Sequence, residues 1–356
     1  MNSIDSYTIY AHADTDGGIA AALFYTFIKR KYPHLKKIHI APVNHGIGLN
    51  DWSLKEITWP CAILDFTLHH YFLNNKFFSQ QSELEALKVS NIPNCYWLDH
   101  HTTGGNLHFI NEKNIAQFVK NFVCLWDTKA ISTPGLMRTH RKELDFPDDI
   151  IKTYEEFIDI ADIVDGALYP NCESAHDFHS FEVQIQSLFT SSYPAIHYDA
   201  LYNRLVRKII KYPKVEDFLD SDPLFKGLIE FEKMKHIKKL KAYEKNSKRY
   251  GDIVISDFSS KHSQFKGLGR FIPYLLHKDA KYSIHIFPAK NDLCSVSCGI
   301  NPWNKENLST HKHIGEYFSK YLQGGGHGFV GGGKLSMSNF KSSLDQLLNF
   351  LSDDRQ

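Results

Sequence analysis

Short apolar runs rich in β-branched and aromatic residues alternate with helical segments through the first hundred residues, and this alternation constrains the fold most. The predicted strands are 7–13, 37–43, 61–66 and 95–101, and the predicted helices between them are 18–31 and 81–90. Strands that alternate with helices favour a parallel sheet with right-handed crossover connections. The first part of the chain is therefore predicted to be an α/β domain with a parallel sheet.

Three of the four predicted strands end in acidic and histidine side chains. These are His12, Asp14 and Asp16 after the first strand, Asp65 after the third, and Asp99, His100 and His101 after the fourth. A single Asp at such a position is ordinarily a turn former or a helix N-cap. Open parallel sheets bind ligands at the carboxyl ends of their strands, so several such ends at one edge indicate a site.

The spacing of His12, Asp14 and Asp16 points to a metal ion. Neighbouring carboxylates raise each other's pKa unless a cation neutralises them. In an extended segment, alternate residues share one side, so these three side chains are predicted to form a comb of ligands. Carboxylate oxygen and imidazole nitrogen without thiolate suit Mn²⁺, Mg²⁺ or Fe²⁺ better than a structural zinc.

The remainder of the chain predicts a helical stretch and then a smaller α/β domain. Residues 148–250 are mainly helical in pattern, and strands and helices alternate again beyond 250. We predict a first domain over 1–200, a helical connector over 201–250 and a second domain over 251–356. Residues 233–249 contain eight basic residues and one glutamate, which indicate either a solvated surface helix or a basic strip facing a ligand.

Composition excludes several classes of protein. Hydrophobic residues make up 42% and charged residues 23% of the 356, and no apolar run approaches a membrane span. The first residues lack the features of a secretory signal, so a cytoplasmic location is expected. The six cysteines include no CxxC pair, which argues against disulfides or a zinc knuckle. A net charge of +1 gives no overall attraction to nucleic acid or anionic membranes.

Five sequence blocks occur in an order that is specific to one family. "HADTDG", "ILDF", "LDHH" and "IADIVDG" are followed near the carboxyl terminus by "GGGH". In this order they resemble the DHH phosphoesterase superfamily with a DHHA1-type second domain. That superfamily includes RecJ-like exonucleases, nanoRNases and cyclic-dinucleotide phosphodiesterases. The resemblance spans both predicted domains and implies a hydrolase that uses two divalent ions, Mn²⁺ first, with Mg²⁺ or Fe²⁺ as alternatives.

The resemblance also implies roles for individual residues. One ion is bound by His12, Asp14 and Asp65, and the other by Asp16, Asp65, His100 and an aspartate of "IADIVDG". That aspartate is Asp162 or Asp165; aligning "IAD" with the family pattern favours Asp162, and Asp159 is a weaker candidate. Asp99 is expected to orient a ligand, and His101 to face the substrate phosphate.

The glycine-rich segment near the carboxyl terminus is the implied substrate-binding element. The resemblance assigns this role to Gly325, Gly326 and His327, and glycine backbones can present N–H groups to a phosphate. The alternative is a flexible loop that caps the preceding helix. The strand "CSVSCGINPW" lacks the arginine that often binds the phosphate in the family. Asn301 or Trp303 could substitute, Trp303 by stacking on a base, and Arg270 or Lys334 could supply charge.

Two further segments are given ordinary explanations. "STPG" at 132–135 is predicted to cap a helix that runs to about residue 143. His69 and His70 follow Asp65 closely and are interpreted as surface histidines.

The function predicted from these features is a Mn²⁺-dependent phosphodiesterase or exonuclease. Because 356 residues accommodate two domains and no further binding modules, we expect the substrate to be a short single-stranded oligonucleotide, a dinucleotide or a nucleotide. The expected partners are therefore these substrates and no membrane, and a homodimer is left open. The alternatives are a phosphomonoesterase acting on 3′-phosphoadenosine 5′-phosphate, a noncatalytic nucleotide-binding module and, more remotely, an inorganic pyrophosphatase.

Overall fold

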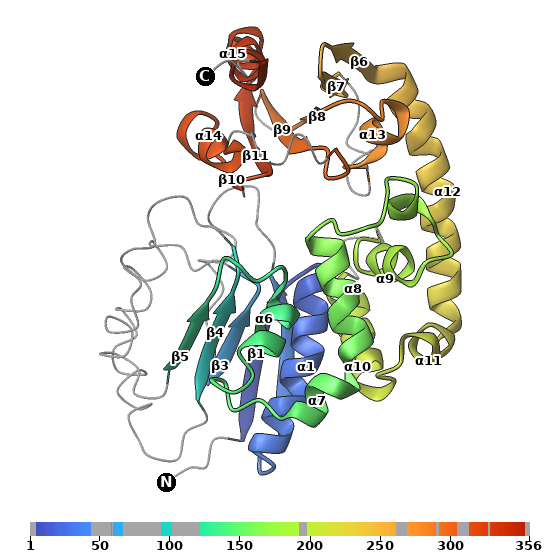
Figure 1. The fold of residues 1–356 in the computed structure, drawn as a ribbon. Helices are drawn as coiled ribbons and strands as arrows, with labels where there is room; N and C mark the ends of the chain where they lie inside the picture. The colour runs from blue at the N-terminus through green and yellow to red at the C-terminus, as the bar shows by residue number, and fades with distance from the viewer. Residues whose placement is uncertain are drawn as a thin grey trace. The chain divides into compact units, whose positions relative to one another are not determined.

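The chain forms two compact units (Figure 1). The structure, a computed structural model, describes residues 5–43, 58, 60–66, 94–101, 122–191, 198–260, 269–289, 292–304, 313–326 and 328–352. Unit 1 comprises Met1–His101, Gly105–Leu168 and Phe181–Leu228, and unit 2 comprises Thr102–Gly104, Tyr169–Ser180 and Ile229–Gln356. The predicted helix 81–90, His69 and His70 lie outside the described residues.

Unit 1 is built on a five-stranded parallel sheet, which confirms the predicted α/β class. Its order is β2-β1-β3-β4-β5, and each pair of neighbours is parallel. The strands are β1 (Ser6–His12), β2 (Lys37–Val43), β3 (Cys61–Leu64), β4 (Cys95–Asp99) and β5 (Phe122–Trp126). β5 was not predicted. All residues of β3 and β4 are buried, as expected of central strands in a parallel sheet.

Helices pack on the sheet and on one another in unit 1. They are α1 (Thr15–Lys31), α6 (Thr133–Thr139), α7 (Asp148–Thr153), α8 (Glu155–Asp165), α9 (Phe181–Phe189), α10 (Tyr198–Lys211) and α11 (Val215–Asp220). α1 and α6 contact the sheet, and α8 packs against both of them (Figure 1). The first turns of α1 are almost wholly buried, so this helix fixes the residues that follow β1 against the rest of the unit.

Unit 2 contains a six-stranded mixed sheet, the second α/β layer that the sequence predicts. Its order is β10-β11-β9-β8-β7-β6, in which β7 and β8 are parallel and the other neighbours antiparallel. The strands are β6 (Ser247–Tyr250), β7 (Ile253–Asp257), β8 (Tyr282–Pro288), β9 (Leu293–Ile300), β10 (Gly325–Gly326) and β11 (Val330–Ser336). The helices are α12 (Pro223–Asn246), whose residues up to Leu228 belong to unit 1, α13 (Ile272–Leu276), α14 (Ile314–Tyr321) and α15 (Phe340–Ser352), with short 3₁₀ turns η3 (Ser174–His176) and η7 (Met337–Asn339). β10, β11 and α15 were not predicted.

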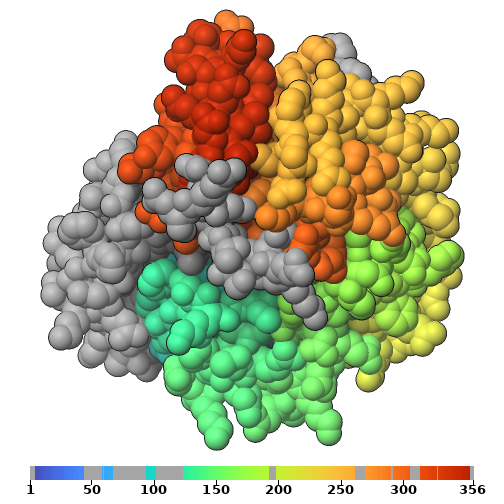
Figure 2. Space-filling view, turned by 45° about the horizontal axis from the view of Figure 1, so that its top comes forward, coloured from blue at the N-terminus to red at the C-terminus, as the bar shows by residue number. Residues whose placement is uncertain are grey.

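The basic stretch 233–249 belongs to α12 and β6. Most of its lysines and arginines are exposed or half-buried, as the solvated-helix interpretation expects. The gold residues of Figure 2, which include the end of α12 and β6, form part of the surface. Lys239 is the exception: it is 3% exposed, and this burial lowers its pKa to about 8.

Most of the cysteines are buried. All six cysteines are free, and five of them are buried. Burial of free cysteine is the ordinary behaviour of this residue. Among the described residues, none of the helices combines the length and the apolar character that crossing a membrane requires.

Candidate metal centre

The residues after β1 form the first cluster of potential metal ligands. His12 is the last residue of β1, and its Nδ1 lies 2.9 Å from Asp14 Oδ2 and 3.5 Å from Asp65 Oδ2. Asp14 is also the N-cap of α1, since its Oδ1 accepts a hydrogen bond of 3.0 Å from the Gly17 N–H. Asp14 therefore caps a helix, which is the ordinary role of an aspartate after a strand, and also belongs to the cluster of potential ligands.

The second cluster lies around His100, just beyond β4. Its Nε2 is 3.3 Å from Asp16 Oδ2, 3.4 Å from Asp65 Oδ1 and 3.6 Å from Asp165 Oδ2. Asp16 comes from the first turn of α1, and Asp165 is the last residue of α8. Four segments that are distant in sequence therefore meet at the carboxyl edge of the sheet.

The predicted comb of three ligands is wrong in one respect. The chain is extended only as far as Asp14, because that residue caps a helix that begins at Thr15. Asp16 consequently points away from the His12 cluster and into the His100 cluster. The residues converge as expected, but through a strand-to-helix turn rather than through one extended segment.

Asp65 joins the two clusters. Its Oδ2 faces His12 and its Oδ1 faces His100, and the side chain is 1% exposed. The residue follows β3 and has φ of 56°, in the left-handed region that Asp tolerates better than most residues. Strained backbone of this kind is typical of functional sites.

His101 lies beside the clusters and is held by Asp99. Its Nδ1 is 2.7 Å from Asp99 Oδ1 and 3.7 Å from Asp65 Oδ1. Asp99 is fully buried, and it also accepts a hydrogen bond from the His101 backbone N–H. This contact orients the His101 imidazole.

Burial and opposite charges set the pKa values in the clusters. Burial alone would lower the pKa of His100, but its hydrogen bonds to Asp16 and Asp65 outweigh burial and raise it to about 12. Burial would also lower the pKa of His101, but the Asp99 hydrogen bond and the Asp65 charge outweigh burial and raise this pKa to about 9. Burial and the nearby Asp65 charge raise the pKa of Asp16. Burial would raise the pKa of Asp65 too, but hydrogen bonds from His100 and His12 lower it.

The donor set fits divalent cations. Within the described ranges, the three groups of candidate ligands are His12, Asp14 and Asp65; Asp16, His100 and Asp165; and Asp65, His100 and His101. In each group the ligand atoms lie within 4.8 Å of one another. Two ligands that are each about 2.1 Å from one ion lie at most about 4.2 Å apart, and the His–Asp distances within the first two groups are all shorter than this. Oxygen and imidazole donors without thiolate suit Mn²⁺, Mg²⁺ or Fe²⁺.

The N-terminus of α6 supports the clusters, although its sequence indicated only a helix cap. The cap is present, because the Ser132 hydroxyl accepts from the Gly135 N–H. The next residue contacts two candidate ligands: the Thr133 N–H lies 3.0 and 3.1 Å from the carboxylate oxygens of Asp16, and its hydroxyl lies 3.3 Å from Asp65 Oδ1. "STPG" is so common as a cap that its sequence carries no signal of this second role.

Asp162 and Asp165 have different surroundings. Asp162 accepts a hydrogen bond from the Ser132 hydroxyl and one of 2.6 Å from Arg138 Nη2, whereas Asp165 faces His100. A Cβ on Gly135 would clash with Asp162 Oδ1, so α6 packs tightly on that carboxylate. Asp159, the weaker candidate, pairs with Arg138 Nη1 at the surface. The geometry thus favours Asp165 as the ligand from this motif.

The predicted substrate residues of unit 2 lie in and around its sheet. Gly325 and Gly326 form β10, where Gly326 has φ of 147° and a Cβ would clash with the Val330 carbonyl. Gly325 has open space around its Cα, so packing does not explain the absence of a side chain there. Lys334 lies in β11, and the exposed Arg270 stacks on Phe271 at 4.6 Å. His327 lies outside the described residues.

Asn301 and Trp303, proposed as substitutes for the missing arginine, are engaged within unit 2. The Asn301 amide donates to the carbonyls of Lys278 and Ala280 and accepts from the Trp303 N–H. The Trp303 indole donates to the Tyr169 carbonyl and packs edge-on against Phe271. Both side chains have structural roles that their sequence positions did not reveal.

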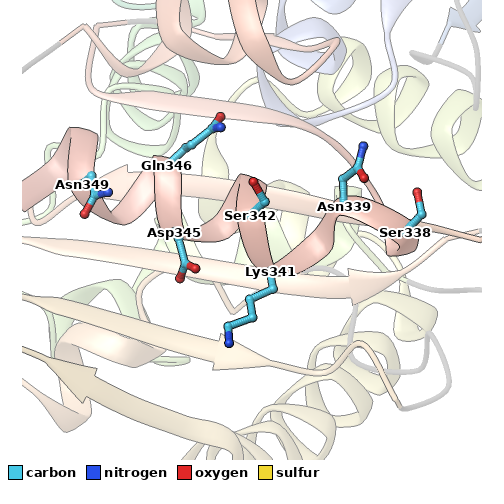
Figure 3. Close-up of a pocket in the computed structure, with 7 residues that line it drawn as sticks. All are labelled: Ser338, Asn339, Lys341, Ser342, Asp345, Gln346 and Asn349. Carbon is cyan, nitrogen blue, oxygen red and sulfur yellow. The ribbon is translucent and has the colours of Figure 1, made fainter.

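A hollow of about 510 Å³ lies over α15 in unit 2 (Figure 3). It is lined by Ser338, Asn339, Lys341, Ser342, Asp345, Gln346 and Asn349. Lys341 and Asp345 point to the same side, four residues apart on one helix face (Figure 3). Since this lining offers a single carboxylate and no imidazole, it lacks the donor set of the clusters in unit 1.

The fold is that of DHH-domain proteins, as two solved structures show. The pGpG-specific phosphodiesterase PggH from Vibrio cholerae is similar over 98% of this chain and 99% of its own, with a TM-score of 0.60 and 17% identity. The DHH domain of a member of the s1p family of ribosomal proteins is similar over 97% of this chain and 86% of its own, with a TM-score of 0.57 and 15% identity. No protein-family model matches the chain, and no curated protein matches it.

Proposed function

We propose that this chain is a metal-dependent phosphoesterase that hydrolyses the phosphodiester bonds of short oligonucleotides or dinucleotides. The observation that carries the proposal is Asp65, whose two oxygens face two adjacent clusters of His and Asp side chains. The DHH fold supports it, because PggH, a pGpG-specific phosphodiesterase, is similar over nearly the whole chain.

In this proposal, His12, Asp14 and Asp65 hold one divalent ion, and Asp16, Asp65, His100 and Asp165 hold the other. Two such ions, when bound, supply an activated water and neutralise charge on the phosphoryl oxygens. Asp99 holds the Nδ1 side of the His101 imidazole, so the other ring nitrogen would donate a hydrogen bond to a phosphoryl oxygen as negative charge develops there. Gly325 lets the backbone of β10 approach a phosphate.

The proposal is tested with the purified chain and a panel of substrates. The panel contains labelled RNA and DNA strands of roughly two to twenty nucleotides, pGpG, cyclic dinucleotides and 3′-phosphoadenosine 5′-phosphate, each with Mn²⁺, Mg²⁺ or Fe²⁺ and with chelator. We expect metal-dependent cleavage that is fastest for the shortest strands, because PggH, which is similar over nearly the whole chain, is a pGpG-specific phosphodiesterase. Absence of turnover on every diester would overturn the proposal, and phosphate release from the nucleotide alone would indicate a phosphomonoesterase.

Removing the Thr133 hydroxyl is expected to weaken the centre without breaking the fold. Thr133→Val keeps the backbone N–H that holds Asp16 and the Ser132 cap, but it removes the donor to Asp65. Residues that orient metal ligands typically contribute 10–100-fold to affinity or activity, and at 3.3 Å this hydrogen bond is long, so we expect a loss of about tenfold in kcat/KM.

The conservative variant Thr133→Ser serves as the control, because it restores the hydroxyl and should recover most of the activity. Steady-state kinetics at several Mn²⁺ concentrations measure both variants. Full activity of Thr133→Val together with a loss in Thr133→Ser would show that the methyl group, and not the hydroxyl, matters.

A further inference from the structure

An exposed tryptophan stands at the edge of the metal centre. Trp126 is the last residue of β5, the edge strand of the described sheet (Figure 1). Its side chain is 43% exposed, although tryptophan is normally among the most buried residues on average. Packing in the core therefore does not explain why a tryptophan occupies this position.

The backbone register places this side chain on the same face of the sheet as Asp99. The two residues are partners across the β4–β5 ladder, and side chains of paired residues in a sheet point to the same face. Asp99 is the residue that holds His101. The indole is thus directed to the side of the sheet on which the centre lies.

A hydrogen bond fixes the indole relative to the centre. Trp126 Nε1 donates to the backbone carbonyl of His101 at 2.8 Å, so the polar edge of the ring is occupied and an apolar face is left for solvent. Because the hydrogen bond already fixes the ring, stacking of a ligand on its face costs little further side-chain entropy.

Other tryptophans in the described part of the chain do not offer such a surface. Trp97 is 1% exposed in the core of unit 1. Trp303 is half-buried, donates to the Tyr169 carbonyl and packs against Phe271 and Tyr274. The base-stacking role that the sequence suggested for Trp303 is therefore better met by Trp126.

We propose that Trp126 is a stacking platform for a nucleobase next to the phosphodiester bound at the Asp65 clusters. The inference rests on the proposed function and deepens it, because it names the substrate class as phosphodiesters that carry a base beside the scissile phosphate. The clusters recognise only the charged phosphate, which polyphosphates share. Stacking on an aromatic face is tolerant of base identity and contributes appreciably to nucleic-acid binding.

The test separates binding from turnover. Calorimetry measures the Kd of a phosphorothioate-linked dinucleotide, and of its analogue without bases, for the wild-type chain, Trp126→Ala and Trp126→Phe in the presence of Mn²⁺. We expect Trp126→Ala to raise the Kd of the dinucleotide about tenfold, which lies within the range of base–aromatic stacking. The Kd of the base-free analogue should stay unchanged, and Trp126→Phe should retain most of the affinity.

Tyr250→Ala is the matched control. Tyr250 is an exposed aromatic residue of β6 in unit 2, and its removal should alter neither Kd. Equal dinucleotide affinity in the wild-type chain and Trp126→Ala overturns the inference, as does an equal loss for the base-free analogue. Failure of the wild-type chain to hydrolyse any diester overturns the proposed function instead, and the binding experiment still decides the role of Trp126.

Discussion

Replacing Asp65 with asparagine is expected to reduce Mn²⁺-dependent hydrolysis of a dinucleotide by about a thousandfold or more, the largest single effect in the chain. The carboxylate faces His12 with one oxygen and His100 with the other. An amide has one oxygen and no charge, so the variant loses a ligand atom from one cluster and the negative charge that both clusters share. Steady-state kinetics and calorimetric titration with Mn²⁺ measure the effect, and both activity and metal affinity should fall.

Asparagine is chosen because it preserves the local backbone. The φ of 56° at Asp65 is tolerated by Asn and Asp better than by other residues with a Cβ. Circular dichroism and the thermal midpoint should therefore show a folded protein. Alanine at this position would add backbone strain to the loss of the ligand and would confuse the two causes.

Asp159→Asn is the matched control for the loss of a carboxylate. Asp159 lies on α8 and pairs with Arg138 at the surface. Because exposed ion pairs contribute little to stability, activity should stay within about threefold of the wild type. A variant Asp65→Asn with a tenth or more of the wild-type activity would contradict the shared role of Asp65.

The first sheet could be predicted from the sequence because local and global signals agree there. Apolar strands, helical segments and polar strand ends all indicate a parallel α/β sheet, and the structure has that sheet. β5 was missed because "FVCLW" is a short apolar run, which periodicity alone cannot distinguish from part of a buried helix. β10 and β11 were missed because glycine is depleted in strands. Their pairing instead depends on close backbone approach, which a Cβ at Gly324 or Gly326 would block.

The site could be predicted only as far as its residues carry a chemical signature. His12, Asp14, Asp16, Asp65 and His100 are of metal-binding type and follow strands, and the structure brings them together. Thr133 contributes through its backbone N–H, which has no signature in sequence. Trp126 acquires its position from the register of β5 on β4, and Trp303 loses its proposed role through packing within unit 2.

The second large effect is expected at Asp165, which the geometry favours over Asp162 as a ligand. Asp165→Asn removes the charge that faces His100 at 3.6 Å, so we expect a loss of about a hundredfold in kcat/KM with weaker Mn²⁺ binding. Asp165 is at the end of α8 and its side chain is 33% exposed. Stability should therefore change by no more than about 0.5 kcal/mol, as for most surface substitutions.

Asp162→Asn should give the opposite pattern. Its carboxylate ties α8 to α6 through Ser132 and Arg138, and hydrogen bonds to charged groups contribute about 1.5–3 kcal/mol each. We therefore expect a free energy of unfolding lower by about 2 kcal/mol, with Mn²⁺ affinity close to that of the wild type. Thermal unfolding and metal titration of both variants measure the two quantities independently.

Sequence spacing cannot separate these two residues, because positions three apart on a helix share a face. The two residues differ in their contacts with α6 and its N-cap, about thirty residues earlier in the chain. Ser132 and Arg138 donate hydrogen bonds to the Asp162 carboxylate, whereas Asp165 faces His100. If Asp162→Asn abolished Mn²⁺ binding while Asp165→Asn stayed active, the ion would have to displace Arg138 from Asp162. The double variant Arg138→Ala, Asp165→Asn would then bind Mn²⁺ more tightly than Asp165→Asn alone, whereas a ligand role for Asp165 leaves both variants equally weak.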